Sequence, residues 1–174
     1  MKDKQAYLQY ICNKYDSTIK VAKSFKNKVG DHIWTRHSKV IDLWSTEDGL
    51  WLLKHVNHRS IMKCELIFDI EYEFADTIFP PNHYYGFKLD QIYTALDKTG
   101  LPYKSYSTGS RGYHVHVFIR KLAYLRRRTR EQLRETVIDE FGCDMQKYSD
   151  KCMIALEDAP HWKTGNLKTL IRER

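Results

Sequence analysis

Two acidic side chains interrupt an apolar segment of the chain, where carboxylates are uncommon. Asp69 and Glu71 lie in KCELIFDIEYEF, residues 63–74, in which β-branched and aromatic residues alternate with acids. This alternation is typical of a strand, and it directs Phe68 and Ile70 to a core and the two acids to the other face. Neighbouring carboxylates repel one another unless a cation joins them, and hard oxygen ligands suit Mg²⁺ or Mn²⁺. The segment therefore predicts a divalent-metal site, with an ordinary solvated strand face as the alternative.

A short turn with two glycines could bind an anion. The segment TGSRG occupies residues 108–112, and glycines let backbone N–H groups approach phosphate oxygens closely. The hydroxyls of Thr108 and Ser110 would add hydrogen-bond donors, and Arg111 would add a charged fork. These features predict a phosphate-binding loop, and a plain hairpin turn is the alternative.

Histidines follow this turn and recur near the end of the chain. His114 and His116 are two positions apart in a predicted strand, so they share one face. The segment HWKTG, residues 161–165, places His161 and Lys163 in a second turn. Positive charge and N–H donors in both turns predict contacts to a triphosphate. The alternative is that the strand histidines are only half buried and have no chemical role.

A run of four arginines opens a predicted helix late in the chain. The run is either a solvated helix face or a salt-sensitive contact to the backbone of a nucleic-acid template. Thr129 and Gln132 have the spacing of a capping box, which predicts the start of the helix there. The run comprises Arg126, Arg127, Arg128 and Arg130.

Helical and extended patterns alternate along the chain. This mixture predicts an α+β fold, with a sheet covered by helices on one face and left free for a ligand on the other. Neither a repeat nor a linker divides residues 1–174, which predicts a single domain. Helices are predicted over 3–14, after Ser45 or Thr46, around 89–96 and around 133–141, and strands over 18–23, 32–35, 63–74, 103–107, 113–119, 151–156 and 167–172.

Composition narrows the class of protein. Lysine and arginine outnumber the acids and give a net charge of +7, which favours polyanionic partners such as nucleic acid. The four cysteines form no C-x-x-C pair, so no zinc site is predicted. No apolar run approaches the roughly 18 residues of a membrane helix. We therefore expect an intracellular protein, cytoplasmic or nucleoid-associated, with no membrane contact.

The order of these segments resembles the archaeo-eukaryotic primase superfamily, which comprises the small catalytic subunits of DNA primase and their primase-polymerase and repair-polymerase relatives. That family carries Asp-x-Asp or Asp-x-Glu on a strand, then Ser-Gly-x-x-Gly-x-His, then a hydrophobic residue followed by Asp, and finally His-x-Lys-Thr-Gly. The matching segments are Asp69-Ile70-Glu71, Thr108 to His114, Cys143-Asp144 and His161 to Gly165, within about residues 60–172.

The resemblance implies a two-metal nucleotidyl transferase on an RRM-like mixed or antiparallel sheet. Such an enzyme would make or extend a primer from nucleoside triphosphates on a single-stranded DNA template, and the implied protein partner is a large primase subunit or a helicase. The implied catalytic metal ligands, for two Mg²⁺ or Mn²⁺ ions, are Asp69, Glu71 and Asp144. The implied triphosphate ligands are Arg111, His114, His161 and Lys163, joined by the hydroxyls of Thr108 and Ser110.

The chain departs from the family pattern at three points. Thr108 replaces the usual serine and keeps the hydroxyl. Glu157 and Asp158 stand where relatives tend to place an arginine or a lysine. The cysteine-rich zinc insert of many cellular primases is missing, because no cysteine lies between Cys64 and Cys143. A minimal catalytic core is therefore expected. The alternative is a weak or inactive primase-like module that binds nucleotide or single-stranded nucleic acid within a replication or repair complex.

Overall fold

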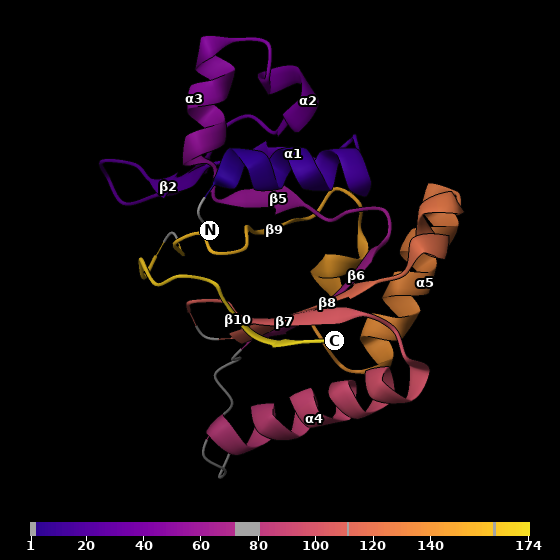
Figure 1. Cartoon of the computed structure of the whole chain (residues 1–174). Helices are drawn as coiled ribbons and strands as arrows, with labels where there is room; N and C mark the ends of the chain where they lie inside the picture. Colours follow the sequence, from indigo (N-terminus) through magenta and orange to yellow (C-terminus); the bar gives the residue numbers. More distant parts are fainter. Residues whose placement is uncertain (1–2, 72–80, 111, 162) are drawn as a thin grey trace.

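Two four-stranded antiparallel sheets form the centre of the molecule (Figure 1). The computed structural model describes residues 3–71, 81–110, 112–161 and 163–174. The main sheet has the order β10-β7-β8-β6, with β6 at Glu65–Glu71, β7 at Tyr103–Ser107, β8 at Gly112–Phe118 and β10 at Thr169–Glu173. The second sheet has the order β4-β1-β5-β9, with β1 at Lys20–Ala22, β4 at Ser38–Lys39, β5 at His58–Ser60 and β9 at Met153–Ala155. A separate hairpin pairs β2 at Ser24–Lys26 with β3 at His32–Trp34.

Strand register in the main sheet brings predicted site residues opposite one another. β6 pairs with β8, so Asp69 lies opposite His114 and Ile67 lies opposite His116. β8 also pairs with β7, which confirms the predicted hairpin around residues 108–112. Residues 72–74 of the strand expected from the sequence lie outside the described residues.

Helices cover one face of the main sheet, as predicted. Phe68 and Ile70 of β6 face α4 (Pro81–Thr99) and α5 (Arg127–Glu140), and the 3-10 turn η1 (Arg120–Tyr124) leads from β8 towards α5. Each fully buried apolar side chain of this kind contributes about 1.5–3 kcal/mol to folding. Other members of this core are Leu66, Leu89, Ile92, Tyr93, Leu96, Val115, Val117, Leu122 and Ile138.

The opposite face of the main sheet is left free for a ligand only in part, at a cavity that Asp69 and His114 line. The second sheet covers part of this face, and Ile67 packs with Ile61 and Ile154 between the two sheets. The covering strands are only two or three residues long. Because such short segments carry too little periodicity to reveal their partners, the sequence did not predict this second layer.

The N-terminal helices pack on the second sheet and form a core of their own (Figure 1). They are α1 at Lys4–Lys14, α2 at Val40–Leu43 and α3 at Glu47–His55. The hydroxyl of Thr46 accepts a hydrogen bond from the N–H of Gly49 at 3.0 Å, which confirms Thr46 as the predicted helix cap. Buried residues of this core include Leu8, Ile11, Val21, Leu53, Val56 and Leu156.

α5 begins before its predicted capping box. Its first residue is Arg127, and Arg126 occupies the N-cap position without a side-chain cap, so Thr129 lies inside the helix and the capping-box prediction is wrong. The guanidinium of Arg130 turns inward and pairs with Asp150. Among the helices that the structure describes, none is both long enough and apolar enough to cross a membrane.

Candidate active site

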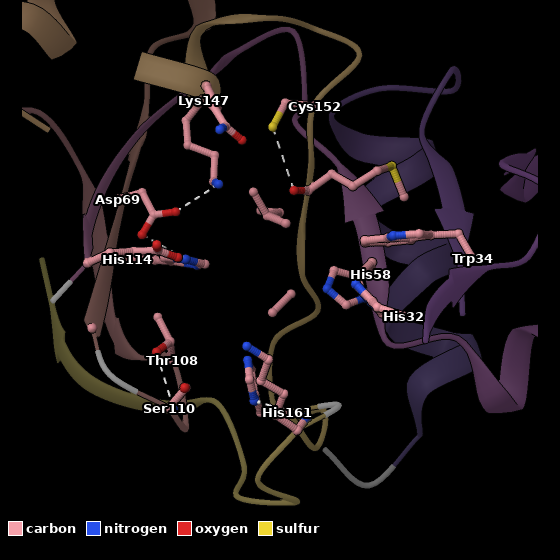
Figure 2. Close-up of a pocket in the computed structure, with 17 residues that line it drawn as sticks. His32, Trp34, His58, Asp69, Thr108, Ser110, His114, Lys147, Cys152 and His161 are labelled. Atoms are coloured by element: carbon pink, nitrogen blue, oxygen red, sulfur yellow. Dashed lines mark hydrogen bonds and ion pairs between the residues drawn. The ribbon is translucent and has the colours of Figure 1, made fainter. Parts of the chain in front are cut away.

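A cavity of about 530 Å³ lies where the main sheet faces the second sheet. We call it the cleft, and its size is within the range of small-ligand sites. Asp69, Thr108 and His114 line it on the side of the main sheet (Figure 2). Trp34 and His58 line it on the opposite side. The cleft therefore presents acids and hydroxyls on one wall and aromatic rings on the other.

Asp69 is almost completely buried on β6, with 1% of its surface exposed. One of its carboxylate oxygens lies 3.3 Å from Nε2 of His114, and the other lies 2.8 Å from Nζ of Lys147. Burial alone would raise the pKa of this carboxyl group, but His114 and Lys147 together outweigh burial and hold the pKa well below its ordinary value. The carboxylate is therefore ionised at neutral pH.

Asp144 lies next to Asp69 because the backbone ties them together. The N–H of Asp144 donates to the carbonyl oxygen of Asp69 at 3.0 Å, immediately before the 3-10 turn η2 (Met145–Tyr148). A carboxylate oxygen of Asp144 lies 3.3 Å from Nζ of Lys147, which thus contacts both acids. Glu71 is exposed and lines the cleft two positions after Asp69 on the same strand.

The donor set of these acids fits a divalent cation. Both carboxylate oxygens of Asp69 are buried, and neither has a hydrogen bond of regular geometry. Asp69 and Asp144 already converge on one positive charge, that of Lys147. Carboxylate oxygens of this kind are the ligands that Mg²⁺ and Mn²⁺ prefer in proteins.

The two predicted phosphate-binding turns, residues 108–112 and 161–165, contact each other. The hydroxyl of Thr164 donates to the carbonyl oxygen of Gly109 at 2.6 Å. Gly109 has φ +76°, and a Cβ there would lie 2.5 Å from the carbonyl oxygen of Asn166. Only glycine satisfies both the positive φ and this close approach.

Polar side chains of both turns line the cleft, so the structure brings the predicted triphosphate ligands together. They are Thr108 and Ser110 from the first turn and His161 and Lys163 from the second. The hydroxyl of Thr108 accepts the N–H of Ser110 at 3.3 Å. Burial, followed by the charges of Lys163 and His114, lowers the pKa of His161. Arg111 lies outside the described residues.

His116 does not line the cleft. It belongs to a group of five buried charged or titratable side chains between the sheets, which we call the charge cluster. Nδ1 of His116 lies 2.7 Å from Glu65, and Nε2 lies 3.0 Å from Nζ of Lys168. Arg59 pairs with Glu65 at 2.8 Å and with Glu157 at 2.5 Å. Glu157, one of the departures from the family pattern, is therefore compensated within the charge cluster.

The charge cluster contains a set of potential metal ligands that its own cations already satisfy. Ligand atoms of Glu65, His116 and Glu157 lie within 4.8 Å of one another. The two carboxylates are matched by the positive side chains of Arg59 and Lys168, which contact the same groups. The cluster consequently acts as an internal ionic network joining the two sheets.

We expect stability to fall as the pH is lowered from about 6.5 to 4. Burial and the charge of Lys168, opposed by Glu65, lower the pKa of His116 to about 4, whereas histidine in an unfolded chain titrates near pH 6.5. The unfolded state therefore binds the proton first. The stability due to neutral His116 is complete above pH 6.5 and is lost as the pH falls towards 4, by at most about 1.4 kcal/mol per pH unit.

Urea unfolding followed by circular dichroism between pH 4 and 8 would measure this slope. His116→Gln should flatten it, because the amide can donate to Glu65 and accept from Lys168 without titrating. The other histidines whose pKa burial lowers, namely His58, to about 3, together with His114 and His161, would supply the slope that remains. An unchanged slope in the variant would show that His116 is not the group that titrates.

Sequence reasoning missed several cleft residues. The ring of Trp34 lies 4.5 Å from that of His58 and 5.2 Å from that of His32, and the side chain is 40% exposed. The sequence offered one sign of such a residue, a tryptophan within the mainly polar segment 31–37. Nothing in the local sequence connects this segment to Asp69. Lys147 was missed because one lysine three residues after an aspartate carries no specific pattern.

The predicted nucleic-acid contacts separate into exposed and buried arginines. Arg126, Arg127 and Arg128 are exposed. Arg130 is 3% exposed, and its pairing with Asp150 makes it part of the fold rather than of a basic surface, which corrects its predicted role. Arg127 also lines a second cavity, of about 350 Å³. Basic residues that share this lining are Lys20, Lys39, Lys63 and Lys151.

Solved structures with the same fold are polymerase domains. The chain is similar to the polymerase domain of Mycobacterium tuberculosis Ligase D in complex with DNA, with a TM-score of 0.62 and 11% identity over 98% of this chain and 80% of that one. It is also similar to the primase-polymerase domain of cyanophage S-2L, with a TM-score of 0.53 and 12% identity over 100% of this chain and 91% of that one. No protein-family model and no curated protein sequence matches. The chain therefore has the fold of archaeo-eukaryotic primase-type catalytic domains.

Proposed function

We propose that this protein is a nucleotidyl transferase of the primase-polymerase type, which makes or extends a primer on a single-stranded DNA template. One observation carries the proposal. Within a fold shared with polymerase domains, the buried Asp69 and the adjacent Asp144 lie beside a cleft that two hydroxyl- and cation-bearing turns also line. Acids for metal and donors for phosphate are the two requirements of this chemistry.

The acidic side of the cleft would hold the metals. Asp69, Glu71 and Asp144 are the proposed ligands, and Asp69 is fixed in orientation by His114 on the neighbouring strand. Two bound divalent ions would lower the pKa of an attacking 3′ hydroxyl and neutralise charge on the leaving pyrophosphate. Burial lowers the pKa of His114, so its ring would orient the carboxylate as a neutral donor.

The two turns would hold the triphosphate. Hydroxyl donors come from Thr108 and Ser110, and Lys163 and His161 add an ammonium group and an imidazole on the same cleft. Because Gly109 holds the turns together, a triphosphate could contact both at once. Charge-assisted hydrogen bonds to phosphate are among the stronger contacts available in a protein.

The aromatic wall would hold the nucleobase. Trp34 is partly exposed and lines the cleft on the side opposite Asp69 (Figure 2). Stacking of a base on an aromatic side chain is worth about 1–3 kcal/mol. Trp34→Ala should therefore raise the KM for nucleotide by about tenfold with a smaller change in kcat, measured by steady-state incorporation.

Matched variants separate stacking from a general loss of structure. Trp34→Phe keeps an aromatic face, so its KM for nucleotide should stay close to that of the wild type. Trp51→Ala removes an exposed tryptophan that stacks on His55 outside the cleft lining, and should leave KM unchanged. If Trp34→Ala weakens only the binding of single-stranded DNA, the stacked base belongs to the template instead.

The direct test of the proposed reaction is nucleotide incorporation. Purified protein would be incubated with labelled nucleoside triphosphates and single-stranded template, with and without a primer, in Mg²⁺, Mn²⁺ or EDTA. Template-dependent products that need a divalent ion are expected, and their formation without a primer would distinguish a primase from an extender. Absence of product under all of these conditions would contradict the proposal.

One observation favours a second candidate, a primase-like module that binds single strands without catalysis. The ammonium group of Lys147 already contacts both Asp69 and Asp144, as expected in a protein that has dispensed with metal. Such a module would bind single-stranded DNA through Arg126, Arg127 and Arg128 in a salt-dependent manner that EDTA does not alter. The incorporation assay separates it from the enzyme.

A further inference from the structure

We infer that Lys147 is an internal cation that occupies the divalent-metal position between Asp69 and Asp144, and that it must leave when a divalent ion binds. The inference rests on the proposed function, because it concerns the same acids. The inference has a consequence for the regulation of metal binding. Without nucleotide the protein binds metal weakly, and a bound nucleotide promotes metal binding because its phosphates accept the displaced ammonium group of Lys147.

The local backbone holds Lys147 in this position. Asp144 caps η2, because its carboxylate accepts the N–H of Gln146 at 2.9 Å, and its carbonyl oxygen accepts the N–H of Lys147 at 3.3 Å. This tight turn places Lys147 over the two acids, with Nζ 2.8 Å from Asp69 and 3.3 Å from Asp144. The ammonium group is therefore positioned by the same turn that positions one of the acids.

Burial makes the contact strong. The side chain of Lys147 is 12% exposed and that of Asp69 is 1% exposed, so water screens the pair little. A buried carboxylate without a partner is costly, and Lys147 removes that cost while no metal is bound. A divalent ion placed between the same oxygens would repel the ammonium group, so the two cations exclude each other.

The displaced side chain has a place to go. Lys147 lines the cleft together with Thr108, Ser110 and Lys163, the residues proposed to hold the triphosphate. A lysine has four flexible methylene groups, so its ammonium group can turn from the acids to a phosphate while the backbone of η2 stays in place. Because coupling between two ligands is reciprocal, a nucleotide that accepts Lys147 also strengthens metal binding.

Manganese titration followed by electron paramagnetic resonance tests the inference without any measurement of catalysis. Without nucleotide, Lys147→Met should bind Mn²⁺ about tenfold more tightly than the wild type, because one competing charge is removed. A non-hydrolysable nucleoside triphosphate should reduce this difference in Mn²⁺ affinity, because it should make the wild type bind Mn²⁺ more tightly. Lys98→Met is the matched control, since it removes an exposed lysine from the end of α4, on the helix-covered face of the main sheet, and should match the wild type.

Thermal unfolding supplies a second readout. In EDTA, Lys147→Met should unfold at a lower temperature than the wild type, because Asp69 loses its ammonium partner, and added Mn²⁺ should restore more stability to the variant than to the wild type. Equal Mn²⁺ affinity and an equal Mn²⁺ stabilisation in the two proteins would overturn the inference.

Introducing Asp69→Asn into the wild type and into the Lys147→Met variant, and measuring Mn²⁺ binding by each protein, separates the inference from the proposed function. If this change abolishes Mn²⁺ binding while Lys147→Met has no effect, the metal site stands and the role of Lys147 is wrong. If Mn²⁺ binds equally well after Asp69→Asn, the ion lies elsewhere, and both the metal site and the inference are overturned. Loss of binding in Asp69→Asn with tighter binding in Lys147→Met supports both.

Discussion

Asp69→Asn should reduce template-dependent nucleotide incorporation by about 10³-fold, the order of loss expected when one preorganised charged group at a reacting centre is removed. Asparagine keeps the size of the side chain but removes the charge that would bind metal. Among the three proposed metal ligands, Asp69 is the one that is fully buried and held on both sides, by His114 and Lys147.

The measurement is the yield of labelled product on a denaturing gel, with Mg²⁺ and with Mn²⁺. Asp139→Asn provides a control with the same chemical change, because Asp139 is exposed near the end of α5. It should stay within about twofold of the wild type, as surface substitutions generally do. Circular dichroism would verify that both variants are folded. Incorporation by Asp69→Asn within about tenfold of the wild type would mean that the reaction does not depend on this carboxylate.

The central part of the fold could be predicted because its signals are local. Alternation through β6 correctly placed Phe68 and Ile70 in the core and Asp69 on the other face. The apolar stripe of α4 and the hairpin between β7 and β8 follow from the same kind of periodicity. Short-range patterns of this type depend only on neighbours along the chain, so one sequence suffices to read them.

The second sheet and the aromatic wall of the cleft could not be predicted, because they depend on pairing between distant residues. Arg59 meets Glu157 across 98 positions of sequence, and Trp34 reaches the cleft through the separate hairpin of β2 and β3. Nothing in the local sequence distinguishes the buried Arg130 from the exposed Arg128 either. The burial of Arg130 depends on Asp150, which lies beyond the end of the helix in the sequence and pairs with the guanidinium.

The charge cluster explains why a sheet with three acids on its ligand-side face can still be covered. Glu65 lies on the same face of β6 as Asp69, but Arg59 of β5 and His116 of β8 satisfy it completely. Further along the strand, Asp69 has a partial set of partners and lines the cleft. The two sheets are thus closed at the charge cluster and separated at the cleft, which places the proposed metal ligands at the boundary.

Arg59→Met should lower the free energy of unfolding by about 3–5 kcal/mol, the usual cost of removing one partner from a buried ionic group. Glu65 and Glu157 would both lose the guanidinium that offsets their burial, at 0% and 6% side-chain exposure. Urea unfolding at pH 7 measures the change. Arg127→Met, the same substitution in the exposed pair with Glu131, should cost about 0.5 kcal/mol or less.

A second substitution tests whether the cost comes from uncompensated charge rather than from lost packing. Adding Glu157→Gln to Arg59→Met removes one of the two stranded carboxylates and should recover part of the lost stability, which gives a favourable coupling energy in a double-mutant cycle. If the losses in free energy of unfolding caused by Arg59→Met and by Glu157→Gln simply add in the double variant, the guanidinium of Arg59 stabilises the fold through its packing contacts alone. A recovered variant that still incorporates nucleotide would show that the charge cluster joins the sheets, while the chemistry depends on the acids of the cleft.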